Sequence, residues 1–248
     1  MSAAHFDRWY TDRSESPVAD DLVRRVLGLP PDLRSTSLLD GAGLDEVVAL
    51  LDLRPGQVLL DLACGRGGYG LEIARRTGCR LVGVDFSAVA IEQARERART
   101  RESGAEFRVG TLTETGLETA SADAVLVVDA MQFADPTVEA LRECRRVLVP
   151  GGRLVITCWE PVVRRDERLS ARLLRMDFAA QLPQAGFVGV DVVERPAWQA
   201  VEKRMWEEVL AVDAPDDPAI RSLQEEARSV LPAFDLRRRV LATAFAPR

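Results

Sequence analysis

The stretch from Val58 to Gly70 constrains the fold of this chain more than any other. An apolar run that contains one acid is followed by a glycine-rich segment and then by a helix-forming sequence. Strand, tight turn and helix in this order form the unit that binds nucleoside cofactors at the carboxyl end of a parallel sheet. The sequence therefore predicts an α/β protein with a nucleoside-type site at this turn.

The glycine pattern alone leaves the ligand open. Gly65, Gly67 and Gly70 have the G-x-G-x-x-G spacing of dinucleotide sites, which other tight turns also meet. Asp61 argues against a dinucleotide, because a carboxylate at the strand tip would repel a pyrophosphate at the helix start. S-adenosylmethionine (SAM) fits better, since it carries an ammonium and a sulfonium, and backbone N–H groups of the turn can bind its carboxylate. A nicotinamide-dependent oxidoreductase and an unrelated glycine-rich turn are the alternatives.

The segment Asp61-x-Ala63-x-Gly65-x-Gly67 resembles the first motif of the class I SAM-dependent methyltransferases, of the bacterial, small-molecule type. Ala63 stands where that family usually has a glycine, and alanine tolerates a positive φ poorly. Residues 141–152, which end in Pro-Gly-Gly, are typical of the helix, turn and fifth strand of the same family. The resemblance covers residues 57–160 well, and residues 176–194 and 239–245 more loosely.

Short apolar strands alternate with helices from residue 57 onward, which predicts a parallel sheet covered on both faces. The resemblance implies a Rossmann-like, mostly parallel sheet of seven strands in the order 3-2-1-4-5-7-6, with helices on both faces and a helical cap or lid. We expect strands at 57–62, 80–85, 106–109, 123–128, 153–158, 187–194 and 239–245, and helices at 18–27, 41–53, 68–77, 88–101, 136–148, 168–182, 199–212 and 218–231.

Residues 1–248 are expected to form a single methyltransferase domain, which is the usual outcome for a chain of this length. Its SAM-binding core would comprise residues 41–195 and 236–248. Residues 1–40 would be a lid over the site or a cover packed on the sheet, and residues 199–235 a helical insert that serves as a substrate cap.

Four segments supply the expected cofactor residues. Asp85 ends the second strand, where an acid can accept hydrogen bonds from ribose hydroxyls, although a helix-capping role is the alternative. Phe86 would lie against adenine or in the core. Thr111 replaces the acid that the family uses for the adenine amino group, so backbone groups near Thr111 would read adenine. The resemblance implies these cofactor-binding residues: Asp61, Ala63, Gly65, Gly67, Asp85, Phe86, Thr111, Leu112, Asp129 and Gln132.

Asp129 follows the fourth strand and would lie beneath the methionine arm of the cofactor, with a loop acid as the alternative. Methyl transfer from a sulfonium depends mainly on alignment of the acceptor, and a base is needed only for a poorly acidic acceptor. The candidates for such a base are His5, Tyr10, Asp129 and Glu160, and the expected substrate pocket contains Trp9, Tyr10, Met131 and Trp159, of which the last two have core roles as the alternative.

The composition excludes several classes of function. The net charge of −6 disfavours a nucleic-acid binder, which usually presents a basic face. The four cysteines form no C-x-x-C pair and there is a single histidine, so we expect neither disulfides nor a metal site. No apolar stretch approaches the length of about 20 residues that spans a bilayer, and the start of the chain lacks an apolar signal core. We therefore expect a cytoplasmic protein.

The sequence predicts SAM-dependent methyl transfer to an O, N or C atom of a small molecule, in secondary metabolism. A methyltransferase acting on RNA or protein and a SAM-binding protein without methyltransferase activity are the alternatives. The acceptor and the oligomeric state do not follow from the sequence.

Overall fold

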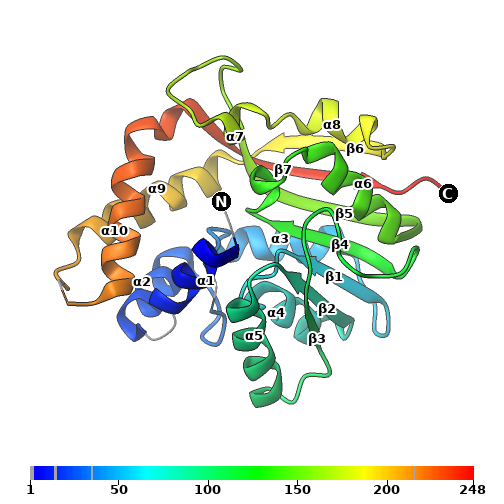
Figure 1. Cartoon of the computed structure of the whole chain (residues 1–248), viewed down its shortest axis with the longest axis horizontal. Helices are drawn as coiled ribbons and strands as arrows, with labels where there is room; N and C mark the ends of the chain where they lie inside the picture. The colour runs from blue at the N-terminus through cyan, green and yellow to red at the C-terminus, as the bar shows by residue number, and fades with distance from the viewer. Residues whose placement is uncertain (1–2, 14–15, 35, 215) are drawn as a thin grey trace.

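The structure is a computed structural model that describes residues 3–13, 16–34, 36–214 and 216–248, with side chains described from Phe6 onward. One seven-stranded sheet runs through it in the order β3-β2-β1-β4-β5-β7-β6, which confirms the expected order (Figure 1). The neighbouring strands β3, β2, β1, β4 and β5 pair in parallel. Strand β7 is antiparallel to both of its neighbours, β5 and β6. The strands are β1 Val58–Leu62, β2 Arg80–Asp85, β3 Glu106–Val109, β4 Ala122–Val128, β5 Leu148–Pro161, β6 Val188–Glu194 and β7 Arg237–Phe245.

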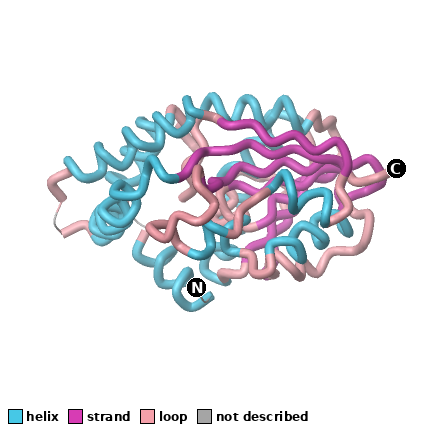
Figure 2. The backbone as a smooth tube through the Cα atoms, turned by 90° about the horizontal axis from the view of Figure 1, so that it is seen from above, coloured by secondary structure: helices cyan, strands magenta, loops and turns pink. Residues whose placement is uncertain are grey.

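Helices lie on both sides of this sheet (Figure 2). Helices α3 and α4 pack against each other, α4 also packs on β1 and β2, and α6 and α8 pack against each other near β5 and β6. The helices are α1 Ala3–Asp12, α2 Pro17–Leu27, α3 Gly41–Leu51, α4 Gly68–Thr77, α5 Ala88–Thr100, α6 Thr137–Val147, α7 Ala171–Leu174, α8 Phe178–Gln184, α9 Pro196–Ala211 and α10 Pro218–Val230, with short 3₁₀ helices η1 Met131–Phe133 and η2 Leu231–Leu236.

The core sits in the central strands. All but one residue of β4 is buried, and Val125, Leu126 and Val127 are fully enclosed. Burial of an aliphatic side chain of this size stabilises a fold by about 1.5–3 kcal/mol. This two-sided burial explains why β4 is a continuous apolar run rather than an alternating one.

The structure differs from the sequence prediction at residues 168–182, which form two short helices rather than one. Asp177 has the extended φ of −157° and its carboxylate accepts a hydrogen bond from the Ala180 N–H, so a new helix begins there. Pro183, expected to end the helix, lies inside α8. The Pro-Gly-Gly segment at 150–152, expected as a turn, belongs to the long strand β5, where a register shift against β4 accommodates it.

Four helices from the two ends of the chain gather beside the sheet: α1, α2, α9 and α10 (Figure 1). Arg13 donates to Glu226 at 2.8 Å and Ser16 donates to Asp217 at 2.5 Å, so the start of the chain is tied to α10. The Ser87 hydroxyl at the start of α5 donates to Asp7 at 2.5 Å and holds α1 against the sheet side. We call this group of helices the cap. Whether it works as a lid or a substrate cap stays a prediction, as does the division into core and cap segments.

In the described residues, none of the helices is long and apolar enough to cross a membrane.

We predict that Glu143 stabilises the fold in a pH-dependent way. Burial raises the pKa of this carboxyl, but hydrogen bonds from Arg146 and Thr115 outweigh it and lower the pKa to about 2 from 4.5. The stabilisation is therefore complete above pH 4.5 and is lost as the pH falls toward 2. Glu143→Gln should lower the free energy of unfolding by about 1–3 kcal/mol at pH 7, measured by urea denaturation.

The control is Glu139→Gln on the exposed side of the same helix, where the ion pair with Arg142 should contribute less than about 1 kcal/mol. If the free energies of unfolding of wild type and Glu143→Gln differed by the same amount from pH 7 to pH 3, the lowered pKa of Glu143 would be contradicted.

Candidate active site

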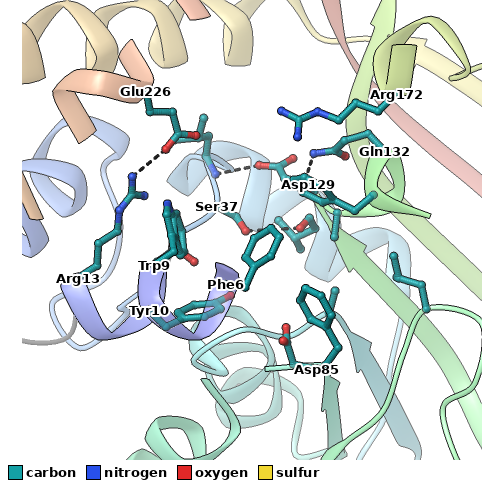
Figure 3. Close-up of a pocket in the computed structure, with 18 of the residues that line it drawn as sticks. Phe6, Trp9, Tyr10, Arg13, Ser37, Asp85, Asp129, Gln132, Arg172 and Glu226 are labelled. Carbon is teal, nitrogen blue, oxygen red and sulfur yellow. Dashed lines mark hydrogen bonds and ion pairs between the residues drawn. The ribbon is translucent and has the colours of Figure 1, made fainter. Parts of the chain in front are cut away.

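A cavity of about 610 Å³ lies between the sheet and the cap (Figure 3). Its floor consists of residues at the carboxyl ends of β1, β2 and β4, and its other walls come from α1, α7 and α10. The side chains that the sequence singled out and that line it are Trp9, Tyr10, Ala63, Asp85, Phe86, Thr111, Leu112, Asp129, Gln132 and Trp159.

The glycine turn between β1 and α4 contains three left-handed residues. Ala63, Gly65 and Gly67 have φ values of 59°, 52° and 75°. A Cβ on Gly67 would lie 2.8 Å from the Phe107 ring, and one on Gly65 would lie 2.6 Å from the Tyr10 hydroxyl. Glycine is thus required at both positions by conformation and by space, whereas Ala63 adopts the left-handed conformation against its steric preference.

Asp85 joins the tip of β2 to this turn. One carboxylate oxygen accepts a hydrogen bond from the Gly65 N–H and the other from the Ser87 N–H, both at 2.9 Å. The Ser87 hydroxyl, rather than Asp85, caps α5 by accepting from the Ala90 N–H. Burial raises the pKa of Asp85, so a ligand that donates hydrogen bonds would stabilise its charged form.

Asp61 lies one layer below the cavity. Its carboxylate accepts from the Gly70 N–H at 3.1 Å and lines a small hollow next to Ala63 rather than the main cavity. Burial raises the pKa of Asp61 from 3.8 to about 7. The acid of the motif therefore holds the start of α4 in place.

The expected adenine region lies at the β2 and β3 end of the cavity. Phe86 is half-buried and meets the Phe6 ring of α1 edge-on at 5.1 Å. The Thr111 N–H donates to the Glu114 carbonyl, and the Glu114 N–H donates back at 3.3 Å. Thr111 and Leu112 thus border the cavity from a closed turn at the end of β3.

Asp129 is fully occupied by protein donors. Its carboxylate accepts from the Leu38 N–H and the Thr157 hydroxyl, each at 2.8 Å, and lies 3.1 Å from the Arg239 guanidinium. Gln132 donates to the Asp129 carbonyl at 2.8 Å and lines the cavity. Asp129 thus forms part of the cavity floor, with three protein donors on its carboxylate.

The structure places five of the expected site residues outside the cavity lining, and they are Asp61, Gly65, Gly67, Met131 and Glu160. Met131 is fully buried in the core. Glu160 accepts hydrogen bonds from the Phe178 N–H and from Arg238 and does not line the cavity. The side chain of His5 lies outside the described residues.

Three aromatic residues of α1, Phe6, Trp9 and Tyr10, line the cavity. Tyr10 is buried, and burial raises the pKa of its hydroxyl far above the ordinary value, so the phenol stays neutral. Trp9 packs edge-on against Tyr10, with the Arg13 guanidinium 3.9 Å above its ring. The far wall holds Trp159, whose indole N–H donates to Glu202 at 2.8 Å.

Sequence reasoning missed Glu202, Arg237, Arg239 and Trp206, which form or support that far wall. Glu202 is fully buried and accepts from Trp159, from Trp206 and from Arg237. An acid between Trp198 and Trp206 on the apolar side of α9 is the signal that could have revealed it, because a buried carboxylate needs partners.

Among the described residues, no three His, Cys, Asp or Glu side chains gather as a metal site would require.

Comparison with known proteins identifies the family. Residues 60–156 match the family described as "Methyltransferase domain". The demethylmenaquinone methyltransferase of Deinococcus radiodurans is 33% identical over 168 residues, which are 67% of this chain and 65% of that protein. The chain spans 31%, 33% and 34% of the length of three other curated relatives.

Solved structures share the whole fold. The phosphoethanolamine N-methyltransferase 2 of Haemonchus contortus, in complex with phosphomonomethylethanolamine and S-adenosylhomocysteine, matches with a TM-score of 0.78 and 21% identity over 100% of this chain and 61% of that one. A geranyl diphosphate methyltransferase, in complex with geranyl diphosphate and sinefungin, matches with a TM-score of 0.75 and 17% identity over 99% and 100%. The chain belongs to the class I SAM-dependent methyltransferases, a family of enzymes whose cofactor is SAM.

We predict that Ala63→Gly stabilises the protein slightly. A left-handed alanine costs about 1–2 kcal/mol, and glycine costs about 0.4–1 kcal/mol through the entropy of the unfolded chain. The net gain in the free energy of unfolding should be about 0–1 kcal/mol, measured by urea denaturation. As a control, Ala74→Gly inside α4 should lose about 0.5–1 kcal/mol. Loss of stability in Ala63→Gly would show that the turn is not strained.

Proposed function

We propose that the whole protein transfers the methyl group of SAM to a small-molecule acceptor inside the cavity between the sheet and the cap. The observation that carries this proposal is the continuity of the cavity, which extends from Asp85 and Ala63, at the start of the glycine turn, to the indole rings of Trp9 and Trp159. One continuous space thus offers a place for a nucleoside cofactor at one end and for an organic acceptor at the other.

The residues at the sheet end fit SAM. In this proposal the Asp85 carboxylate accepts from the ribose hydroxyls, and Phe86 lies against the adenine ring. Backbone groups around Thr111 and Leu112 read the adenine edge. Asp61 and the three left-handed residues shape the turn whose N–H groups face the methionine carboxylate. SAM supplies an activated methyl group, and the protein binds and orients it.

The chain's own residues favour catalysis by alignment. The two acids proposed as bases, Asp129 and Glu160, are held by protein donors, and burial keeps Tyr10 neutral. Holding the acceptor in line with the methyl group can lower the barrier by about 7–11 kcal/mol without proton transfer. We infer that the acceptor loses its proton to water or is nucleophilic as bound.

Two observations support a small acceptor over a macromolecule. Cap residues such as Trp9 and Glu226 line the cavity together with residues of the sheet, which leaves less room for a nucleic acid or a protein loop (Figure 3). The chain also carries a net charge of −6. The similar proteins named above act on, or are bound to, small molecules by their titles. Placement in secondary metabolism and in the cytoplasm stays a prediction.

Calorimetry with SAM, S-adenosylhomocysteine and NAD tests the cofactor site. We expect binding of the first two and none of NAD. Asp85→Ala should weaken the binding of S-adenosylhomocysteine at least tenfold, because the ribose hydroxyls and the Gly65 N–H lose their shared acceptor.

The matched control is Asp123→Ala at the opposite end of the sheet, where the carboxylate accepts from the Val58 N–H. Both variants should lose stability, but the Asp123 variant should keep its cofactor affinity. Equal affinities for the two variants would show that Asp85 is only structural. A radiolabelled methyl-donor assay on metabolite extracts then distinguishes an enzyme from a SAM-binding protein.

A further inference from the structure

The acceptor half of the cavity combines aromatic rings with guanidinium groups. Its rings belong to Trp9, Phe133, Trp159 and Trp206. Three arginines that are buried or half-buried line the same space, and they are Arg13 directly after α1, Arg172 of α7 and Arg237 of β7. Such a wall suits a flat apolar body, which the rings cover, together with a polar group that the arginines bind.

Arg237 offers a hydrogen-bond donor to the cavity. The side chain is 9% exposed, and its Nη2 donates to Glu202 at 2.6 Å. Its Nε is buried without a hydrogen-bond partner among the described residues, and the side chain borders the cavity. Glu202 also accepts from the indole N–H groups of Trp159 and Trp206, so the guanidinium and the two rings are fixed relative to one another.

The inner charges around this wall are mostly positive. Among the described lining residues, Glu226 acts on Arg13, Arg172 and Arg237 alike, and Asp129 of the cavity floor also acts on Arg237. Burial lowers the pKa of each of these three guanidiniums, which measures the cost of removing the cation from water. The other charged lining residues of this half, Arg8, Asp12 and Glu225, are exposed at the rim.

Arg172 adds a second cation on the α7 side. Its guanidinium lies 5.0 Å from the centre of the Phe133 ring and points into the cavity above Gln132 (Figure 3). A bound anion would offset the desolvation of Arg172 and of Arg237 at once, and planar guanidiniums match carboxylate and phosphate geometry.

We propose that the acceptor is a ring-sized apolar molecule with an anionic group, and that Arg237 and Arg172 bind that group. This inference rests on the proposed function, because it assigns the other half of the same cavity to the acceptor. A cationic acceptor, bound through Glu226, is the contrary outcome.

The experiment uses the full chain loaded with S-adenosylhomocysteine and three indole probes that differ in charge: indole-3-acetate, indole-3-acetamide and tryptamine. Calorimetry should give an affinity for the acetate at least tenfold above that for the amide, with tryptamine weakest. Inorganic phosphate, added as a competitor, should weaken the binding of indole-3-acetate but not that of indole-3-acetamide. This measurement distinguishes a site that accepts phosphate from one that requires a carboxylate.

Two variants locate the anion. Arg172→Met and Arg237→Met should each reduce acetate binding at least fivefold and leave amide binding within twofold. Arg237→Met also leaves Glu202 with fewer partners, so thermal unfolding must show that it folds, and Arg172→Met carries the test if it does not. Arg168→Met is the control, because Arg168 is exposed, pairs with Asp166 and lies outside the cavity lining.

Equal binding of acetate and amide, stronger binding of tryptamine, or no binding of any probe would overturn the proposal. The probes are also titrated into the protein without cofactor. Failure of S-adenosylhomocysteine to bind would count against the proposed function, while the anion preference would still be measured.

Discussion

The buried carboxylate of Asp129 is the interaction on which the rest of the site depends. Asp129 sits in the left-handed region, with a φ of 55°, directly after β4. From there it accepts from the Leu38 N–H, from Thr157 of β5 and from Arg239 of β7. One side chain thus connects the segment before α3, the central sheet and the antiparallel addition. Removal of one partner from such a buried pair typically costs about 3–5 kcal/mol, because the remaining charge stays buried.

The same charge network continues into the cap. Arg239 is fully buried, and its guanidinium lies 3.5 Å from Glu202 on α9. Glu202 in turn holds Arg237 and the indoles of Trp159 and Trp206. The floor under the methyl-donor end and the wall of the acceptor end are therefore joined through two arginines and two carboxylates. This chain of contacts holds α9 of the cap against β5 and β7 of the sheet.

The local patterns of the sequence were sufficient to predict the sheet and its strand order, but not the side-chain contacts that join the cap to it. Asp61, the glycine turn and Asp85 lie next to each other in sequence or on neighbouring strands, so their roles follow from strand order. The break at Asp177 was missed because helix periodicity does not register one extended residue. The cavity wall was missed for a different reason, since Glu202 and Arg237 are 35 residues apart and only packing brings them together. Charged residues in those segments look like solvated surface until their burial is known.

The two ends of the cavity are built by different parts of the fold, so the acceptor can change while the cofactor site stays the same. The residues that fit the cofactor belong to the parallel sheet, where Asp85 and the turn are fixed by strand geometry. In the proposed function, the residues that face the acceptor come from α1, α7, α9 and α10, from η1, and from the ends of β5 and β7. In this proposal, replacement of a side chain such as Arg172 on α7 would change the acceptor without disturbing the donor site. Glu202 would not be replaceable in this way, because four buried side chains depend on its charge and its hydrogen bonds.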